Sequence, residues 1–289
     1  MRKSIITLAV LLLFIIAGCG QEKKEPFTRD SYPRVDGSTV TIPLSEGLAS
    51  GLLGMSGEEA KQFVKHNKTH RAYVNLIEGS ADIIFVTEPS PDELALAKEK
   101  NIDLEVVPVV KDAFVFLVNV KNPVDTLTVE QVQGIYQGSI VNWKEAGGPD
   151  REIVAYQRPR NSGSQTIMEN MVMKNLKMAE PRKEYVPAGM GDLIEKVAGY
   201  DNSDRALGYS VYYYARDMYN KDTIKMIGIN GVKPEKKSIM RGEYPFSIAY
   251  YAVIRKSEPE NSPARKLLKW VLSKEGQALV ENAGYVPVK

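Results

Sequence analysis

Hydrophobic and polar positions follow two alternating patterns from Tyr32 to the end of the chain. Short apolar runs bounded by polar turns are typical of buried strands, and apolar residues that recur every three or four positions are typical of helices. Strands and helices that take turns along a chain indicate an α/β protein. We therefore predict an α/β fold.

The pattern places the individual elements as follows. Strands are expected to start at Val35 and to cover 81–86, 106–110, 113–118, 153–157, 224–229 and 247–255. Helices are expected to start at Pro43 and to cover 91–100, 129–136, 164–178, 193–198 and 263–282, the last one followed by Gly284. Proline at the start of a helix and glycine after its end are the usual boundary residues.

The N-terminus has a different pattern, with Arg2 and Lys3 followed by a mostly apolar run over residues 5–17. This run is shorter than the roughly 20 residues that a bilayer-spanning helix needs, so residues 1–18 are predicted to be a signal peptide. The run ends in Ile-Ala-Gly-Cys19, which resembles the lipobox of bacterial lipoproteins and predicts acylation of Cys19, for example with palmitate. A plain signal peptide with a chance cysteine, or a short membrane anchor, are the alternatives.

Length, charge and cysteine count limit the number of domains and the kinds of function that the chain can have. Cleavage before Cys19 leaves 289 − 18 = 271 residues, which exceeds the usual size of one domain and favours two lobes. Removal of Arg2 and Lys3 leaves 38 − 2 = 36 basic residues against 36 acidic ones, and this balance argues against nucleic-acid binding. Cys19 is the only cysteine, so no disulfide is predicted. Residues 19–31 are polar and charged and are predicted to be a tether.

Three segments place a hydroxyl residue where a helix is expected to begin: Thr39, Thr69 and the stretch 158–165. A helix start presents unpaired N–H groups and the positive end of the helix dipole, so it suits an oxyanion. Each segment also has an ordinary explanation, because threonine is a common N-cap and Ser162 with Gln165 matches a capping box. The third segment is the strongest candidate because it adds an arginine and a glycine to two serines.

The order of these motifs resembles the phosphate-binding component of bacterial phosphate-specific ABC transporters, within the type II periplasmic-binding-protein fold. The motifs that carry the resemblance are Asp36-Gly-Ser-Thr39 with Pro43, Gly79-Ser-Ala-Asp82, Leu127-Thr-Val-Glu-Gln131, Asn142-Trp143, Gly147-Gly148, Arg158, Ser162-Gly-Ser164 and Leu207-Gly-Tyr209. The resemblance implies two lobes joined by crossing hinge strands that close on the ligand. The lobes would be 32–118 plus 251–289 and 119–250, with crossings near Val118-Asn119 and Tyr250-Tyr251.

The resemblance also implies a ligand set, which falls on Thr39, Val40, Thr69, Arg158, Ser162 and Ser164. The chain departs from the family after the 81–86 strand. Family members have an aspartate there, which accepts the proton of hydrogen phosphate and repels sulfate. Thr87 occupies that position here and Glu88 follows it, so both are candidate ligand-binding residues. An oxyanion is expected, with phosphate as the favoured anion.

Two other groups of side chains are less informative. His66 and His70 stand four residues apart, but Lys65, Lys68 and Arg71 surround them, so no metal and no cofactor is predicted. The tyrosine-rich stretch 209–214 could stack on an organic ligand, although packing at a lobe interface is the favoured interpretation.

The sequence thus predicts a monomeric binding protein, anchored by lipid to the extracytoplasmic face of the cell membrane, that delivers an oxyanion to the permease of an ABC transporter. A surface anion sensor or adhesion lipoprotein with the same fold is the alternative. An enzyme is not expected, because the chain lacks the Gly-x-Ser-x-Gly, phosphate-loop and His-Glu-x-x-His motifs.

Overall fold

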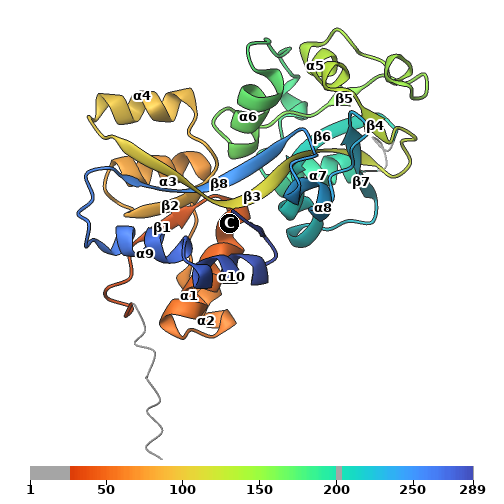
Figure 1. The fold of residues 1–289 in the computed structure, drawn as a ribbon. Helices are drawn as coiled ribbons and strands as arrows, with labels where there is room; N and C mark the ends of the chain where they lie inside the picture. Colours follow the sequence, from red (N-terminus) through yellow and green to blue (C-terminus); the bar gives the residue numbers. More distant parts are fainter. Residues whose placement is uncertain (1–26, 200–203, 289) are drawn as a thin grey trace, which may run out of the picture.

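The computed structural model describes residues 27–199 and 204–288. These residues form two bodies of strands and helices, joined by the long strands β3 and β8 (Figure 1). The predicted α/β fold with two lobes is therefore confirmed. The predicted signal peptide, Cys19 and most of the predicted tether lie outside the described residues. None of the helices within the described ranges has the length and apolar character that a bilayer crossing requires.

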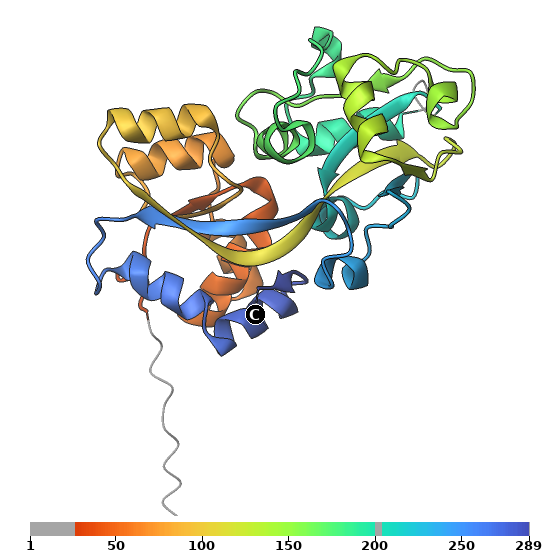
Figure 2. The same ribbon diagram turned by 45° about the horizontal axis from the view of Figure 1, so that its top comes forward.

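The first lobe is built on a mixed sheet. Strand β1 (Val35–Gly37) is parallel to β2 (Ile83–Val86), which is antiparallel to β8 (Ser247–Arg255), and β8 pairs in turn with the first part of β3 (Leu104–Asn119). The short strand β9 (Val286–Pro287) also pairs with β3. Helices α3 (Thr69–Ile77) and α4 (Pro91–Glu99) lie on one side of this sheet (Figures 1 and 2). The other side carries α1 (Ile42–Leu53), α2 (Gly57–Phe63), α9 (Pro263–Val271) and α10 (Lys274–Asn282).

The second lobe is built on the last part of β3, which pairs with β6 (Ala206–Val211) and β7 (Ile224–Ile229). Strand β5 (Val154–Ala155) runs parallel to β6, and β4 (Thr126–Leu127) runs parallel to β7. The α-helices of this lobe are α5 (Val129–Gln137), α6 (Gly163–Ile167), α7 (Met190–Ala198) and α8 (Lys236–Met240). Two 3₁₀ turns cover Trp143–Ala146 and Lys183–Tyr185, and two π-helical segments cover Met168–Met173 and Tyr214–Met218.

Strand β3 passes from one lobe to the other without a break, where the sequence predicted two separate strands. It pairs with β8 as far as Ala113 and with β6 from Phe114 onward. The change of sheet therefore lies before the expected crossing at Val118-Asn119. The continuity has a local reason, because the polar pair Lys111-Asp112 between the two apolar runs stays in register with β8.

The predicted C-terminal helix 263–282 is two helices, α9 and α10, that meet at Ser273. The hydroxyl of Ser273 accepts a hydrogen bond from the Gly276 N–H at 3.1 Å and so caps the second helix. A Cβ on Gly276 would lie 2.2 Å from the carbonyl oxygen of Trp270, so the turn requires glycine. The helix predicted over 164–178 ends earlier than expected. It consists of α6 followed by a π-helix that ends at Met173.

Candidate functional site

A cavity of about 520 Å³ lies between the two lobes. Its walls come from the loops that follow β1, β2 and β5, from the 3₁₀ turn Thr39–Thr41 and from the first turns of α3, α6 and α7. The end of β6 and the segment after it add Val211, Tyr214 and Tyr219. Ligand sites of α/β proteins commonly lie beyond the carboxyl ends of strands in this way. Seven of the eight residues predicted to bind the ligand line the cavity: Thr39, Val40, Thr69, Thr87, Arg158, Ser162 and Ser164. Their role in binding stays a prediction.

A buried carboxylate, Asp36, organises the wall of the first lobe. It accepts hydrogen bonds from the N–H of Gly37, from both the backbone and the side chain of Asn67, and from the side chain of Asn75. These bonds fix the loop that leads into Thr69. Asp36 therefore has a structural role, and the hydroxyl residues that follow it reach the cavity.

Two helix starts of the first lobe face the cavity. Thr39 opens a short 3₁₀ turn that continues into α1, and Thr69 is the first residue of α3. The first N–H groups of a helix have no partner within the helix, so they are available to an anion. Lys68, which precedes Thr69 and also lines the cavity, has φ 69°. A non-glycine residue in this left-handed region is uncommon and concentrates at functional sites.

The hydroxyls of Thr87, Ser162 and Ser164 are buried and have no hydrogen-bond partner within the protein. They make up half of the six side-chain oxygens in that state among the described residues, and all three line the same cavity. An unpaired buried hydroxyl costs roughly 1–3 kcal/mol, so such groups normally have a partner. A bound oxyanion would supply that partner to all three.

The capping-box interpretation of Ser162 and Gln165 does not hold in the structure. Ser162 precedes α6, but its side chain makes no capping hydrogen bond. The side-chain oxygen of Gln165 instead accepts hydrogen bonds from the backbone N–H of Arg158 and from the hydroxyl of Tyr209. Gln165 therefore holds the arginine segment in place and leaves the serine hydroxyl to the cavity.

Arg158 is buried, with 6% of its surface exposed. Its Nε donates to the carbonyl oxygen of Pro187 at 3.1 Å, and its Nη2 donates to that of Ala188 at 2.9 Å, while Nη1 takes part in neither bond. Burial lowers the pKa of the guanidinium, but an arginine keeps its proton in a protein. The side chain is thus a fixed positive charge on the cavity wall.

The two lobes touch at the cavity. A Cβ built on Gly163 would lie 2.7 Å from the hydroxyl oxygen of Thr69 and 2.7 Å from that of Thr87. Beside this contact, the carboxylate of Asp92 on α4 accepts hydrogen bonds from Arg160 at 2.6 Å and from Asn161 at 2.9 Å. Only glycine at position 163 allows this approach of the two lobes.

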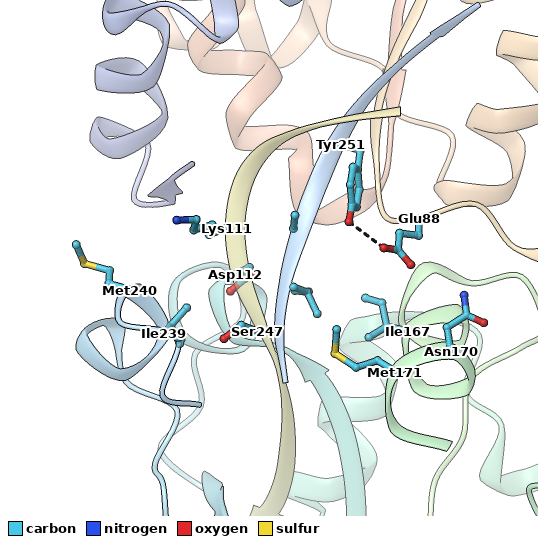
Figure 3. Close-up of a pocket in the computed structure, with 13 residues that line it drawn as sticks. Glu88, Lys111, Asp112, Ile167, Asn170, Met171, Ile239, Met240, Ser247 and Tyr251 are labelled. Carbon is cyan, nitrogen blue, oxygen red and sulfur yellow. Dashed lines mark hydrogen bonds between the residues drawn. The ribbon is translucent and has the colours of Figure 1, made fainter. Parts of the chain in front are cut away.

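Glu88 is the predicted site residue that the structure does not bring to the cavity. Its carboxylate accepts a hydrogen bond from the hydroxyl of Tyr251 at 2.9 Å and faces a neighbouring pocket of about 360 Å³ (Figure 3). The opposite wall of that pocket carries Ile167, Asn170 and Met171. Adjacent residues of an extended chain point to opposite sides, so Thr87 faces the cavity and Glu88 turns away from it.

The cavity has further lining residues that the sequence did not single out as ligands, among them Lys68, His70, Asn161, Met190, Asp192 and Tyr219. Asp192 and Met190 belong to the start of α7, for which the sequence carries no proline or hydroxyl cap. The two histidines have separate partners, since His66 contacts the carbonyl oxygen of Ser38 and His70 contacts Glu93. The structure places no cluster of potential metal ligands within its described ranges.

Comparisons with a family profile and with known proteins place the chain in the same family. The profile of a family described as a PBP superfamily domain matches residues 36–275. The phosphate-binding protein PstS of Bacillus subtilis (strain 168) is 28% identical over 309 aligned positions, which cover 100% of this chain and 95% of that protein. The phosphate-binding protein PstS of Staphylococcus aureus (strain bovine RF122 / ET3-1) is 27% identical over 256 positions, which cover 87% of this chain and 76% of that one.

A solved structure has the same fold. The crystal structure of an ABC-type phosphate transport receptor from Vibrio cholerae superposes with a TM-score of 0.64 and 20% sequence identity, and the match covers 88% of this chain and 98% of that one. The predicted type II periplasmic-binding-protein fold is therefore confirmed.

Proposed function

The chain belongs to the PBP superfamily, and within it we propose that it is the solute-binding component of a phosphate ABC transporter. It captures phosphate between its two lobes outside the cytoplasm and presents it to the permease. It acts as a binding protein and not as an enzyme. The relatives to which it is similar are named phosphate-binding proteins. No feature of the described residues favours the alternative of a surface sensor or adhesion lipoprotein.

The observation that carries the proposal is the convergence of three buried hydroxyls without partners on one cavity that also holds Arg158. Thr87 comes from the first lobe, and Ser162 and Ser164 come from the second. A tetrahedral oxyanion would accept hydrogen bonds from the hydroxyls of both lobes, from the guanidinium of Arg158 and from the helix N–H groups near Thr39 and Thr69. Ligand binding would thereby hold the lobes together.

Lipid attachment and the partner belong to the same proposal. Cys19 would carry the acyl chains, and the body beyond residue 31 would stand off the membrane surface as a monomer. Two acyl chains anchor a protein stably, whereas one does so only marginally. The closed protein would then dock on the permease subunits of the transporter.

Calorimetry of the full-length protein in mild detergent tests the binding function. Phosphate should bind, and Ser164→Ala should weaken it by roughly threefold to tenfold, the value of one neutral hydrogen bond. The matched control is Ser210→Ala, because the Ser210 hydroxyl is also buried without a partner but does not line the cavity. Failure to bind phosphate, or equal losses in the two variants, would contradict the proposal.

A further inference from the structure

The cavity is much larger than a phosphate ion. A water molecule takes up about 30 Å³ in the liquid, and a five-atom oxyanion displaces only a few waters. Pockets of about 300–1,000 Å³ usually hold organic ligands, and this one has about 520 Å³. The size does not come from separated lobes, because Gly163 already meets Thr69 and Thr87 and Asp92 already binds Arg160.

The part of the cavity that the anion would leave empty has an apolar and aromatic wall. Met190, Val211, Tyr214 and Tyr219 of the second lobe line it. The rings of Tyr214 and Tyr219 are parallel within 10°, with centroids 5.8 Å apart. The hydroxyl of Tyr219 donates to Glu195 at 2.7 Å, which fixes this wall in place. A preformed surface of this kind suits a small organic group.

The wall also contains a carboxylate. Asp192 is the single acidic residue among the described residues that line the cavity, and its Oδ2 accepts a hydrogen bond from the Gly189 N–H at 2.8 Å. A carboxylate accepts hydrogen bonds from a donor and repels a second negative charge. An organic group at this wall would therefore bear an ammonium or another donor.

The chemistry around the hydroxyls also suits a substituted phosphate. Thr87 stands where the resemblance expects an aspartate, and Glu88 turns away, so no carboxylate among the described residues of the first lobe lines the cavity. An obligatory proton acceptor for hydrogen phosphate is thus absent from that side among the described residues. A phosphate monoester has a second pKa of about 6 and carries no proton on its phosphoryl oxygens above that pH. All of these oxygens can then accept from Thr87, Ser162, Ser164 and Arg158.

Building on the proposed function, we infer that the cavity also accepts phosphate monoesters that carry an ammonium group. The phosphoryl group lies among the hydroxyls of Thr87, Ser162 and Ser164. The organic group lies against Tyr214, and its ammonium faces Asp192.

Calorimetry with three ligands tests this inference on the full-length protein. The ligands are inorganic phosphate, propyl phosphate and O-phosphoethanolamine, of which the two esters have nearly the same shape and differ in a terminal methyl or ammonium. Both esters should bind, and O-phosphoethanolamine should bind roughly tenfold or more tightly than propyl phosphate. In Asp192→Asn this ratio should fall to about threefold or less, while Asp222→Asn, an exposed substitution in the same lobe, should keep it. Because the readout is a ratio of affinities, a general loss of folding or closure does not imitate the result.

The outcomes separate the inference from the proposed function. Binding of phosphate with exclusion of both esters would overturn the inference and leave the proposed function intact. Binding of both esters with a ratio of affinities that Asp192→Asn does not change would also overturn it, because Asp192 would then not contact the ammonium. Absence of binding by phosphate and by both esters would overturn the proposed function itself.

Discussion

The carboxylate of Asp112 accepts a hydrogen bond of 2.5 Å from the hydroxyl of Tyr250. Asp112 lies on β3 and Tyr250 on β8, so the bond joins the two strands that connect the lobes. The same carboxylate accepts from the N–H of Ala113 at 2.8 Å and from the N–H of Tyr213, in the second lobe, at 3.2 Å. Burial raises the pKa of Asp112 to about 7, against the opposing effect of these bonds.

The raised pKa of Asp112 predicts a pH-dependent stability. Between about pH 4 and pH 7 the folded protein keeps a proton on Asp112 that the unfolded chain has lost. The stabilisation from that proton is full below about pH 4, falls as the pH rises to about 7, and is then constant. The total change is on the order of 4 kcal/mol.

Asp112→Asn tests this prediction, because the amide mimics the protonated carboxyl at every pH. Urea unfolding of both proteins between pH 5 and pH 8 should show that the wild type loses stability relative to the variant as the pH rises. A constant difference between the two free energies of unfolding across this range would show that Asp112 does not titrate there.

Sequence patterns located most elements because each buried strand and amphipathic helix has its own periodicity. They also located the core of the candidate site, since Arg158 and the Ser162-Gly-Ser164 stretch stand together in the chain. What they missed depends on contacts between distant segments. The approach of Gly163 to Thr69 and Thr87 joins the two lobes. Asp192 lines the cavity together with Arg158, which binds the carbonyl oxygens of Pro187 and Ala188 just before α7.

The choice between Thr87 and Glu88 was open for a related reason. Neighbouring residues after a strand point to opposite sides, so the sequence indicates that only one of them faces a ligand between the lobes. It does not indicate which one, because β2 is apolar on both sides and is buried throughout.

Arg158→Ala should weaken phosphate binding about 10-fold to 150-fold, because a charge-assisted hydrogen bond is worth about 1.5–3 kcal/mol. Arg158→Lys should lose less, since it keeps the charge without the planar group that contacts Pro187 and Ala188. Arg151→Ala, which removes an exposed arginine paired with Asp204, is the control and should leave the affinity measured by calorimetry unchanged. Wild-type affinity in Arg158→Ala would remove the arginine from the site.

Gly163→Ala should weaken phosphate binding by tenfold or more and leave thermal stability close to that of the wild type. The added methyl would collide with the hydroxyls of Thr69 and Thr87 only when the lobes approach each other, so it opposes closure and not folding. Gly57→Ala introduces the same change at a helix start with open space around it and is the control. If calorimetry gave equal affinities for Gly163→Ala and the wild type, the lobe contact would have no part in binding.

Cys19→Ser should abolish incorporation of a labelled fatty acid and release the protein from the membrane fraction. Cys19 is the only cysteine in the chain and follows an apolar run that ends in Ile-Ala-Gly. Metabolic labelling with radioactive palmitate measures the first effect, and fractionation of the cells measures the second. Equal labelling of the wild type and the variant would exclude Cys19 as the attachment site.

Thr87→Asp should raise the preference for phosphate over sulfate, and Glu88→Gln should not change it. Thr87 faces the cavity with an unpaired hydroxyl that can donate to either anion, so the wild type should discriminate weakly. A carboxylate at that position would accept the proton of hydrogen phosphate but would face sulfate as an unpaired like charge, which is strongly unfavourable when buried. The carboxylate of Glu88 already accepts a hydrogen bond from the Tyr251 hydroxyl outside the cavity, so removal of its charge should not change anion binding. Calorimetry with both anions gives the ratio of affinities for each protein. A marked loss of phosphate preference in Glu88→Gln, with no gain in Thr87→Asp, would mean that Glu88 enters the cavity when the ligand is bound.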